Sequence, residues 1–186
     1  MALRGVVQKI RQALGAFAAD QSGLSAVEFA LLLPFMAILY LGSVEVGQGV
    51  AIDRMVALTA STVTNVVSQY TVVSASQDMP DILNASAQIL TPYSAANVSV
   101  TVSCITIDNA GKATVTWSQA LHTKARTVGA TVTVPAALAT PNTTLILGEA
   151  NYTYTPLIDF LHLGTLNLYS SEYMFPRSSP TITLGA

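Results

Sequence analysis

The sequence has few charged residues for its length. Of its 186 residues, 10% are Asp, Glu, Lys or Arg and 51% are hydrophobic, whereas an average soluble domain has about 25% charged residues. This composition excludes a disordered acidic or basic chain and is not typical of a cytosolic enzyme surface. The formal net charge is -2 and no basic run follows the first eleven residues, which argues against a nucleic-acid partner.

Cysteine and histidine are also scarce. Cys104 is the single cysteine, so an intrachain disulfide and a cysteine-based zinc cluster are both excluded, and we expect a buried, apolar side chain. The two histidines are His122 and His162, and neither lies in a sequence motif for catalysis or metal binding. The sequence therefore predicts neither an enzyme nor a protein that binds a cofactor, a metal or a small-molecule substrate.

One long apolar segment contrasts with the polar remainder. Residues 29–44 contain no charge. Residues 24–44, called the apolar segment below, would extend about 31 Å as an α-helix, which matches a bilayer core of about 30 Å. Three cations precede it within residues 1–23, which predicts a single-pass protein with a cytoplasmic N-terminus and residues 46–186 outside.

Two other interpretations of the apolar segment are weaker. A cleaved secretory signal would have Pro34 inside its hydrophobic region and Glu28 at its edge, and no good cleavage pattern follows. A buried core helix would present a polar face, but none occurs within residues 29–44. Insertion into a membrane is the interpretation that the pattern favours.

Glu28 is the residue of the apolar segment that needs an explanation. An ionised acid costs about 3 kcal/mol at the centre of a membrane helix and less near its edge, and such groups are usually paired. Arg11 is seventeen residues upstream, too far to pair within one helix. A cut between Gly23 and Leu24 would create an α-amino group one helical turn before Glu28. The alternative is an interfacial glutamate that reaches the lipid headgroups.

Residues 23–34, GLSAVEFALLLP, resemble the start of TadE-like proteins, the minor pilins (pseudopilins) of the bacterial tight-adherence, or Flp-type, pilus. The hairpin pattern at 98–118, YTYTPL at 152–157 and FPR at 175–177 are similar to later parts of the family pattern. The resemblance therefore covers most of the chain.

The resemblance implies a site and a set of partners. Gly23 corresponds to the residue before a prepilin-peptidase cut, Leu24 to the new N-terminus, Glu28 to the charge-pairing acid and Phe29 to the aromatic residue after it. The implied partners are this peptidase, other pilin subunits, the inner-membrane assembly platform and membrane lipid. The implied location is the bacterial inner membrane with a periplasmic C-terminal domain, from which the subunit enters or primes an extracellular pilus. The alternative function is a membrane-anchored periplasmic binding or accessory domain of a secretion system.

Proline and glycine residues in the predicted helix allow two interpretations each. Pro34 predicts a kink, either a bend that helps the helix leave the bilayer or a tolerated local distortion. Gly42 and Gly47 would form either a small-residue face for packing against another pilin helix or a locally weak point in the helix.

The periodicity predicts an α+β fold of three parts: a basic leader at 1–23, a long helix at 24–70, and an extracytoplasmic domain at 71–186. The outer part of the helix carries an apolar stripe that includes Ile52, Val56 and Val63, with Thr64 and Ser68 predicted on the opposite, polar face. A small antiparallel sheet is expected to pack on this stripe. Its predicted elements are a helix at 80–90, strands at 98–104, 112–121, 143–155 and 165–175, a turn at 108–111, a loop at 123–142 with a short helix at 135–139, and one or two helical turns at 157–163.

Overall fold

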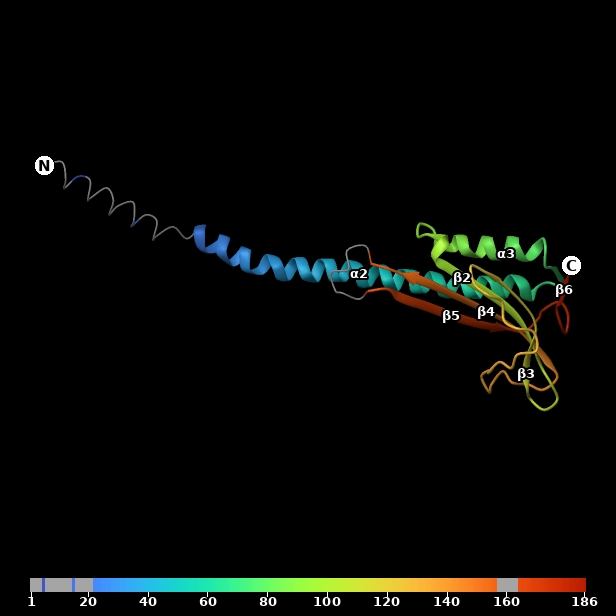
Figure 1. The fold of residues 1–186 in the computed structure, drawn as a ribbon. Helices are drawn as coiled ribbons and strands as arrows, with labels where there is room; N and C mark the ends of the chain where they lie inside the picture. Colours follow the sequence, from blue (N-terminus) through green and yellow to red (C-terminus); the bar gives the residue numbers. More distant parts are fainter. Residues whose placement is uncertain (1–4, 6–14, 16–21, 157–163) are drawn as a thin grey trace. The chain divides into compact units, whose positions relative to one another are not determined.

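The computed structural model describes residues 5, 15, 22–156 and 164–186, which form two compact units, Met1–Glu45 and Val46–Ala186 (Figure 1). Nearly all of the predicted basic leader lies outside the described residues, as do His162 and the helical turns predicted at 157–163. The architecture is α+β, with a long apolar helix near the N-terminus and a small antiparallel sheet, as predicted.

The long helix α2 comprises Ser22–Ser68 and continues through Pro34. It ends two residues earlier than predicted, because the next two backbone N–H groups close tighter turns: Gln69 donates to Val66 and Tyr70 to Val67. The carbonyl of Ser68 accepts a bond from the backbone N–H of Arg177 at 2.8 Å. The end of the helix is therefore formed by local tight turns and is also held by a long-range contact that no local pattern contains.

In the second unit, residues 46–68 of α2, called the packing segment below, lie on one face of the sheet. Ile52, Val56 and Val63 are fully buried at the helical spacing that the sequence predicts. They join a core with Val100 and Val102 of the sheet. Burial of such side chains contributes about 1.5–3 kcal/mol each, so this contact holds the helix on the sheet.

The prediction that Thr64 and Ser68 lie on a polar face is wrong, since both are fully buried. The Thr64 hydroxyl donates to the Ala60 carbonyl at 2.6 Å, and that of Ser68 to the Asn65 carbonyl at 2.7 Å. Because each hydroxyl is satisfied by its own helix, it can be buried at little cost. The buried face of the helix is consequently wider than the positions of its apolar residues alone indicate.

The helix approaches the sheet most closely at Gly148. A Cβ added there would overlap Thr64 Oγ1 and would lie 2.9 Å from the Ala60 carbonyl oxygen and 3.0 Å from Val63 Cγ1. Only a residue without a side chain allows the helix backbone to lie this close to the strand. Gly148 thus sets the distance between the packing segment and the sheet.

All four predicted strands are present, and they pair antiparallel in the order β3-β2-β4-β5 (Figure 1). Neighbouring residues along each strand face opposite sides, so one side meets the packing segment. The Asp108 carboxylate accepts bonds from the N–H groups of Ala110 and Lys112, which confirms the predicted turn between the first two strands. The bounds are β2 Val98–Ile107, β3 Ala113–Leu121, β4 Thr143–Tyr154 and β5 Leu166–Met174.

The other face of the sheet, called the outer face below, is apolar at one end. Ile105, Val115 and Leu145 are buried there beneath Val132 of the loop between β3 and β4. This loop has no helix at 135–139, contrary to the prediction; residues 136–138 form a turn. The loop is held along β3 instead, because the Val115 N–H donates to the Ala130 carbonyl and the Val132 N–H to the Ala113 carbonyl. These bonds place Val132 over the apolar end of the sheet, and its burial there outweighs local helix formation.

The remaining elements of the second unit pack near the C-terminal end of α2. Helix α3, Asp78–Ala87, is followed by a 3-10 turn, Gln88–Leu90, which matches the helix predicted at 80–90. A parallel pair of short strands, β1 Val72–Ser74 and β6 Thr183–Gly185, was not predicted. The buried Trp117 indole N–H donates to the Ile182 carbonyl at 2.7 Å, which ties the C-terminal segment to the sheet.

Candidate functional site

The first candidate site is the apolar segment with the predicted cut. Every residue from 23 to 40 is exposed, including Leu31 at 66% and Leu39 at 73%. An exposed apolar surface of this extent needs lipid or protein around it. By its length and composition the helix could span a membrane, which is compatible with a membrane anchor.

The predicted processing residues lie together near the start of the described helix. Gly23, Leu24 and Glu28 are all exposed residues of α2. Leu24 and Glu28 are four residues apart and therefore share one face of the helix. Within the described residues, none forms an ion pair or a hydrogen bond with Glu28. The charge match that the sequence predicts is thus not supplied by the part of the uncut chain that the structure describes.

The glycines of this helix differ in what surrounds them. A side chain added at Gly23 or Gly47 would meet nothing within 4 Å, so neither glycine is needed for packing within the described residues. Gly42, Phe29 and Pro34 also lie on α2. Their predicted roles in bending and subunit packing stay predictions.

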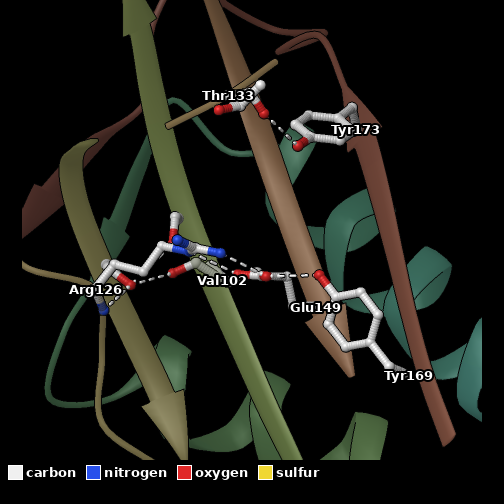
Figure 2. Close-up of polar contacts among 8 residues, drawn as sticks. Val102, Arg126, Thr133, Glu149, Tyr169 and Tyr173 are labelled. Atoms are coloured by element: carbon white, nitrogen blue, oxygen red, sulfur yellow. Dashed lines mark hydrogen bonds and ion pairs between the residues drawn. The ribbon is translucent and has the colours of Figure 1, made fainter. Parts of the chain in front are cut away.

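The second candidate site is a polar cluster at the other end of the outer face, shown in Figure 2. The Arg126 guanidinium binds both carboxylate oxygens of Glu149, at 2.8 Å from Nε and 2.6 Å from Nη2. The Tyr169 hydroxyl donates to the same carboxylate at 2.8 Å. Three elements therefore meet here: the loop after β3, the inner strand β4 and the edge strand β5.

The loop residue Arg126 is fixed at its backbone as well. Its N–H donates to the Ser118 hydroxyl at 3.0 Å, and that hydroxyl donates in turn to the Val102 carbonyl at 3.1 Å. Further along the loop, the Tyr173 hydroxyl donates to the Thr133 carbonyl at 3.4 Å (Figure 2). The guanidinium is thus presented in a fixed position rather than on a free side chain.

These bonds shift the titration of the groups involved. Burial alone would raise the pKa of Glu149, but the hydrogen bonds from Arg126 and Tyr169 outweigh it, so the pKa of this carboxyl is lowered. The bond to Glu149 raises the pKa of Arg126 further. Burial and the same carboxylate raise the pKa of Tyr169. The cluster is therefore one anion held between a cation and a neutral phenol at neutral pH.

Cys104 and the described histidine, His122, both lie within the folded domain. Cys104 is fully buried, as expected, and burial raises its pKa to about 11, which keeps the thiol protonated and unreactive. A ring nitrogen of His122 lies 2.9 Å from the Val98 carbonyl oxygen. Within the described ranges, no group of three or more His, Cys, Asp or Glu side chains could hold a metal ion.

The cluster of Arg126, Glu149 and Tyr169 was missed by sequence reasoning. Its members are 20 or more residues apart, and no short motif joins them. One signal was available: Glu149, Asn151 and Thr153 alternate with buried residues, which marks the polar side of a strand. Which loop residue would cover that side depends on the tertiary fold.

Comparison of the chain with protein-family models, with curated protein sequences and with solved structures finds no match.

Proposed function

We propose that this chain is a TadE-like minor pilin of a tight-adherence pilus, a structural subunit that a prepilin peptidase processes and that assembles through its N-terminal helix. The observation that carries the proposal is the arrangement of α2. Its residues 23–40 are exposed and, apart from Ser25 and Glu28, carry no polar side chain until Tyr40, whereas its packing segment is built into the core of a folded domain. A helix of this kind can hold a subunit in lipid and later in a filament of similar helices.

The cut would give Glu28 its partner. Hydrolysis of the peptide bond between Gly23 and Leu24 leaves a carboxylate on Gly23 and an ammonium group on Leu24. The ammonium group is then one helical turn from Glu28 on the same helix, and the same group of a neighbouring subunit can also approach this acid. In an apolar surrounding, pairing of the two charges removes a cost that either would carry alone.

Two features of the helix support processing and assembly. Gly23 has open space around its Cβ position, so recognition by a peptidase is a better reason for glycine there than packing. Gly47 has the same open space, which leaves a small-residue surface that a second helix could approach. In this proposal, the subunit waits in the bacterial inner membrane with its N-terminus cytoplasmic and its C-terminal domain periplasmic, bound by the assembly platform.

Mass spectrometry of the mature protein tests the processing step. The proposal expects a first residue of Leu24 in cells that contain the peptidase, and an intact N-terminus in cells that lack it. An intact N-terminus in assembled pili would contradict the proposal. A mature chain that starts near Val50 would instead indicate an ordinary signal peptide.

Substitution of Glu28 tests the pairing. We expect Glu28→Ala to be cut normally but to assemble poorly, as measured by immunoblotting of sheared pili. Asp53→Asn is the matched control, because Asp53 is an exposed acid on the same helix but lies in the folded domain. Normal piliation of the Glu28 variant would count against the pairing role.

A membrane-anchored periplasmic accessory domain is the second candidate function. The observation that favours it is the polar cluster around Arg126 and Glu149, which an anchored binding domain would use without entering a filament. In that case the chain keeps its original N-terminus and stays in the membrane fraction after pili are sheared from the cells.

A further inference from the structure

The polar end of the outer face contains a cleft that the proposed pilin function does not use. Its volume is about 220 Å³, smaller than the roughly 300–1,000 Å³ of sites for drug-sized ligands. The cleft is therefore suited to one small ring. Lining side chains include Ser99, Thr101, Lys124, Arg126, Asn151 and Tyr169.

A ligand in this cleft would be bound by side chains and not by backbone groups. Ser99 and Thr101 are on β2, and Asn151 is on β4. These are the two inner strands of the sheet, so their backbone N–H and C=O groups are used by neighbouring strands. A peptide that recognises a free strand edge would have nothing to pair with here.

The charges of the cleft favour an anionic ligand. Lys124 and Arg126 face one acid, Glu149, which leaves an excess of one positive charge. Both Glu149 oxygens already accept hydrogen bonds from Arg126 or Tyr169, so this carboxylate serves to hold the other two groups in place. Among the described residues, Nη1 of Arg126 has no acceptor, and it remains available to a ligand.

The uncharged groups favour a ligand with hydroxyl groups. Ser99, Thr101 and Asn151 offer hydroxyl and amide groups within the cleft. The Asn151 Oδ1 atom is buried and accepts no hydrogen bond among the described residues, an unusual state for a buried acceptor. The Asn151 amide therefore has hydrogen-bonding capacity that the described residues do not use.

Tyr169 adds a flat apolar surface beside these groups. Tyr169 is 56% exposed, although its hydroxyl donates a hydrogen bond to Glu149. The ring is thus held in position at one end while much of the side chain stays open to solvent. A ring that is amphipathic and preorganised can cover the C–H face of a bound sugar at low entropic cost.

We propose that this cleft binds a single acidic sugar unit, a pyranose that carries a carboxylate, as part of a surface glycan. Lys124 and Nη1 of Arg126 bind the carboxylate, Ser99, Thr101 and Asn151 bind ring hydroxyls, and Tyr169 covers one face of the ring. The site lies wholly within residues 99–169 of the folded domain, so it does not depend on the cut at Gly23.

Saturation-transfer NMR on the full chain in glycan-free lipid nanodiscs tests the proposal. The probes are methyl glucuronide, the neutral methyl glucoside, acetate and inorganic phosphate. We expect the glucuronide to bind about tenfold more tightly than the glucoside or acetate, because a charge-assisted hydrogen bond and the ring contacts both contribute. Absence of transfer to the glucuronide would overturn the proposal.

Two further results would also overturn it. Equal binding of acetate or phosphate would show a simple anion site, and equal binding of the glucoside would show that the carboxylate is not recognised. The variant Lys124→Gln should lower glucuronide affinity about tenfold. Lys112→Gln, in the hairpin turn outside the cleft, is the matched control and should leave affinity unchanged. Because Lys124 is exposed, its replacement leaves the fold intact, and an unchanged affinity of this variant would contradict the assignment.

Discussion

Glu149 connects three elements through one carboxylate. It is 13% exposed, and it accepts hydrogen bonds from the loop residue Arg126 and from Tyr169 of the edge strand. A carboxylate that is buried this far is stable because these donors replace the water that it has lost. The ionised Glu149 therefore adds one contact that holds the loop between β3 and β4 on the outer face.

The free energy of unfolding should depend on the ionisation of Glu149. The pKa of this carboxyl is lower in the folded protein than its ordinary value of 4.5. The stabilisation is therefore complete above pH 4.5 and is lost as the pH falls through the native pKa. Thermal unfolding of the full chain in detergent, followed from pH 7 downwards, should show this loss.

A variant separates Glu149 from the other acids. Glu149→Gln should be less stable at neutral pH and should show a flatter pH dependence, since it has no charge to lose. Glu172→Gln, on the neighbouring strand and exposed, should keep the pH dependence of the original protein. Identical pH profiles for all three proteins would refute the role given to Glu149.

Gly148 should tolerate no side chain. We expect Gly148→Ala to reduce the free energy of unfolding by about 3 kcal/mol, because the added methyl group must displace the helix backbone at Ala60 as well as two side chains. Gly47→Ala is the control, since its Cβ would meet open space and alanine favours the helix. Urea unfolding compares the two, and equal stabilities would contradict the close approach.

At the scale of elements, the C-terminal segment fixes the end of α2 to the sheet. Its strand β6 pairs with β1, the first strand after the helix. The Trp117 indole N–H donates to the carbonyl of Ile182, the residue just before β6. Loss of the indole N–H would leave a buried carbonyl without a donor, which costs about 1–3 kcal/mol. The segment is therefore part of the core and not a loose tail.

Trp117→Phe tests this contact. We expect it to lower the free energy of unfolding by about 1–3 kcal/mol and to speed amide hydrogen exchange in Val72–Ser74 more than in the central strands. Tyr173→Phe also removes one hydrogen bond made by an aromatic side chain, but the bond from the Tyr173 hydroxyl is long and exposed. We therefore expect a smaller loss in the free energy of unfolding. Unaltered exchange in β1 would argue against a coupled C-terminal segment.

Among the elements, the pattern of the strands and of both helices could be predicted, because it depends on local periodicity. The β1–β6 pair could not be predicted, because its strands have three residues each and lie at opposite ends of the domain. The absent helix at 135–139 has a related cause. Burial of Val132 and its neighbours against the outer face outweighs the weak tendency of a short segment to form a helix.

At the scale of the whole molecule, the folded core belongs to residues 46–186. Both apolar clusters lie entirely within this unit. We expect the fragment Val46–Ala186 to be soluble and to unfold cooperatively, whereas the full chain requires detergent or lipid for its apolar segment. Sedimentation and circular dichroism would measure this. Aggregation of the fragment, or loss of its strand signal, would show that the apolar segment contributes to folding.

The sequence by itself determined the α+β class, the apolar helix with Glu28 inside it, and the four strands, since these follow from hydrophobicity and from periods of 3.6 and 2 along the chain. Only the tertiary structure decided that Thr64 and Ser68 are buried, that glycine is required at 148, and that Arg126 meets Glu149 and Tyr169. These depend on residues distant in the chain that approach within bonding distance, and periodicity contains no information about which distant residues will meet.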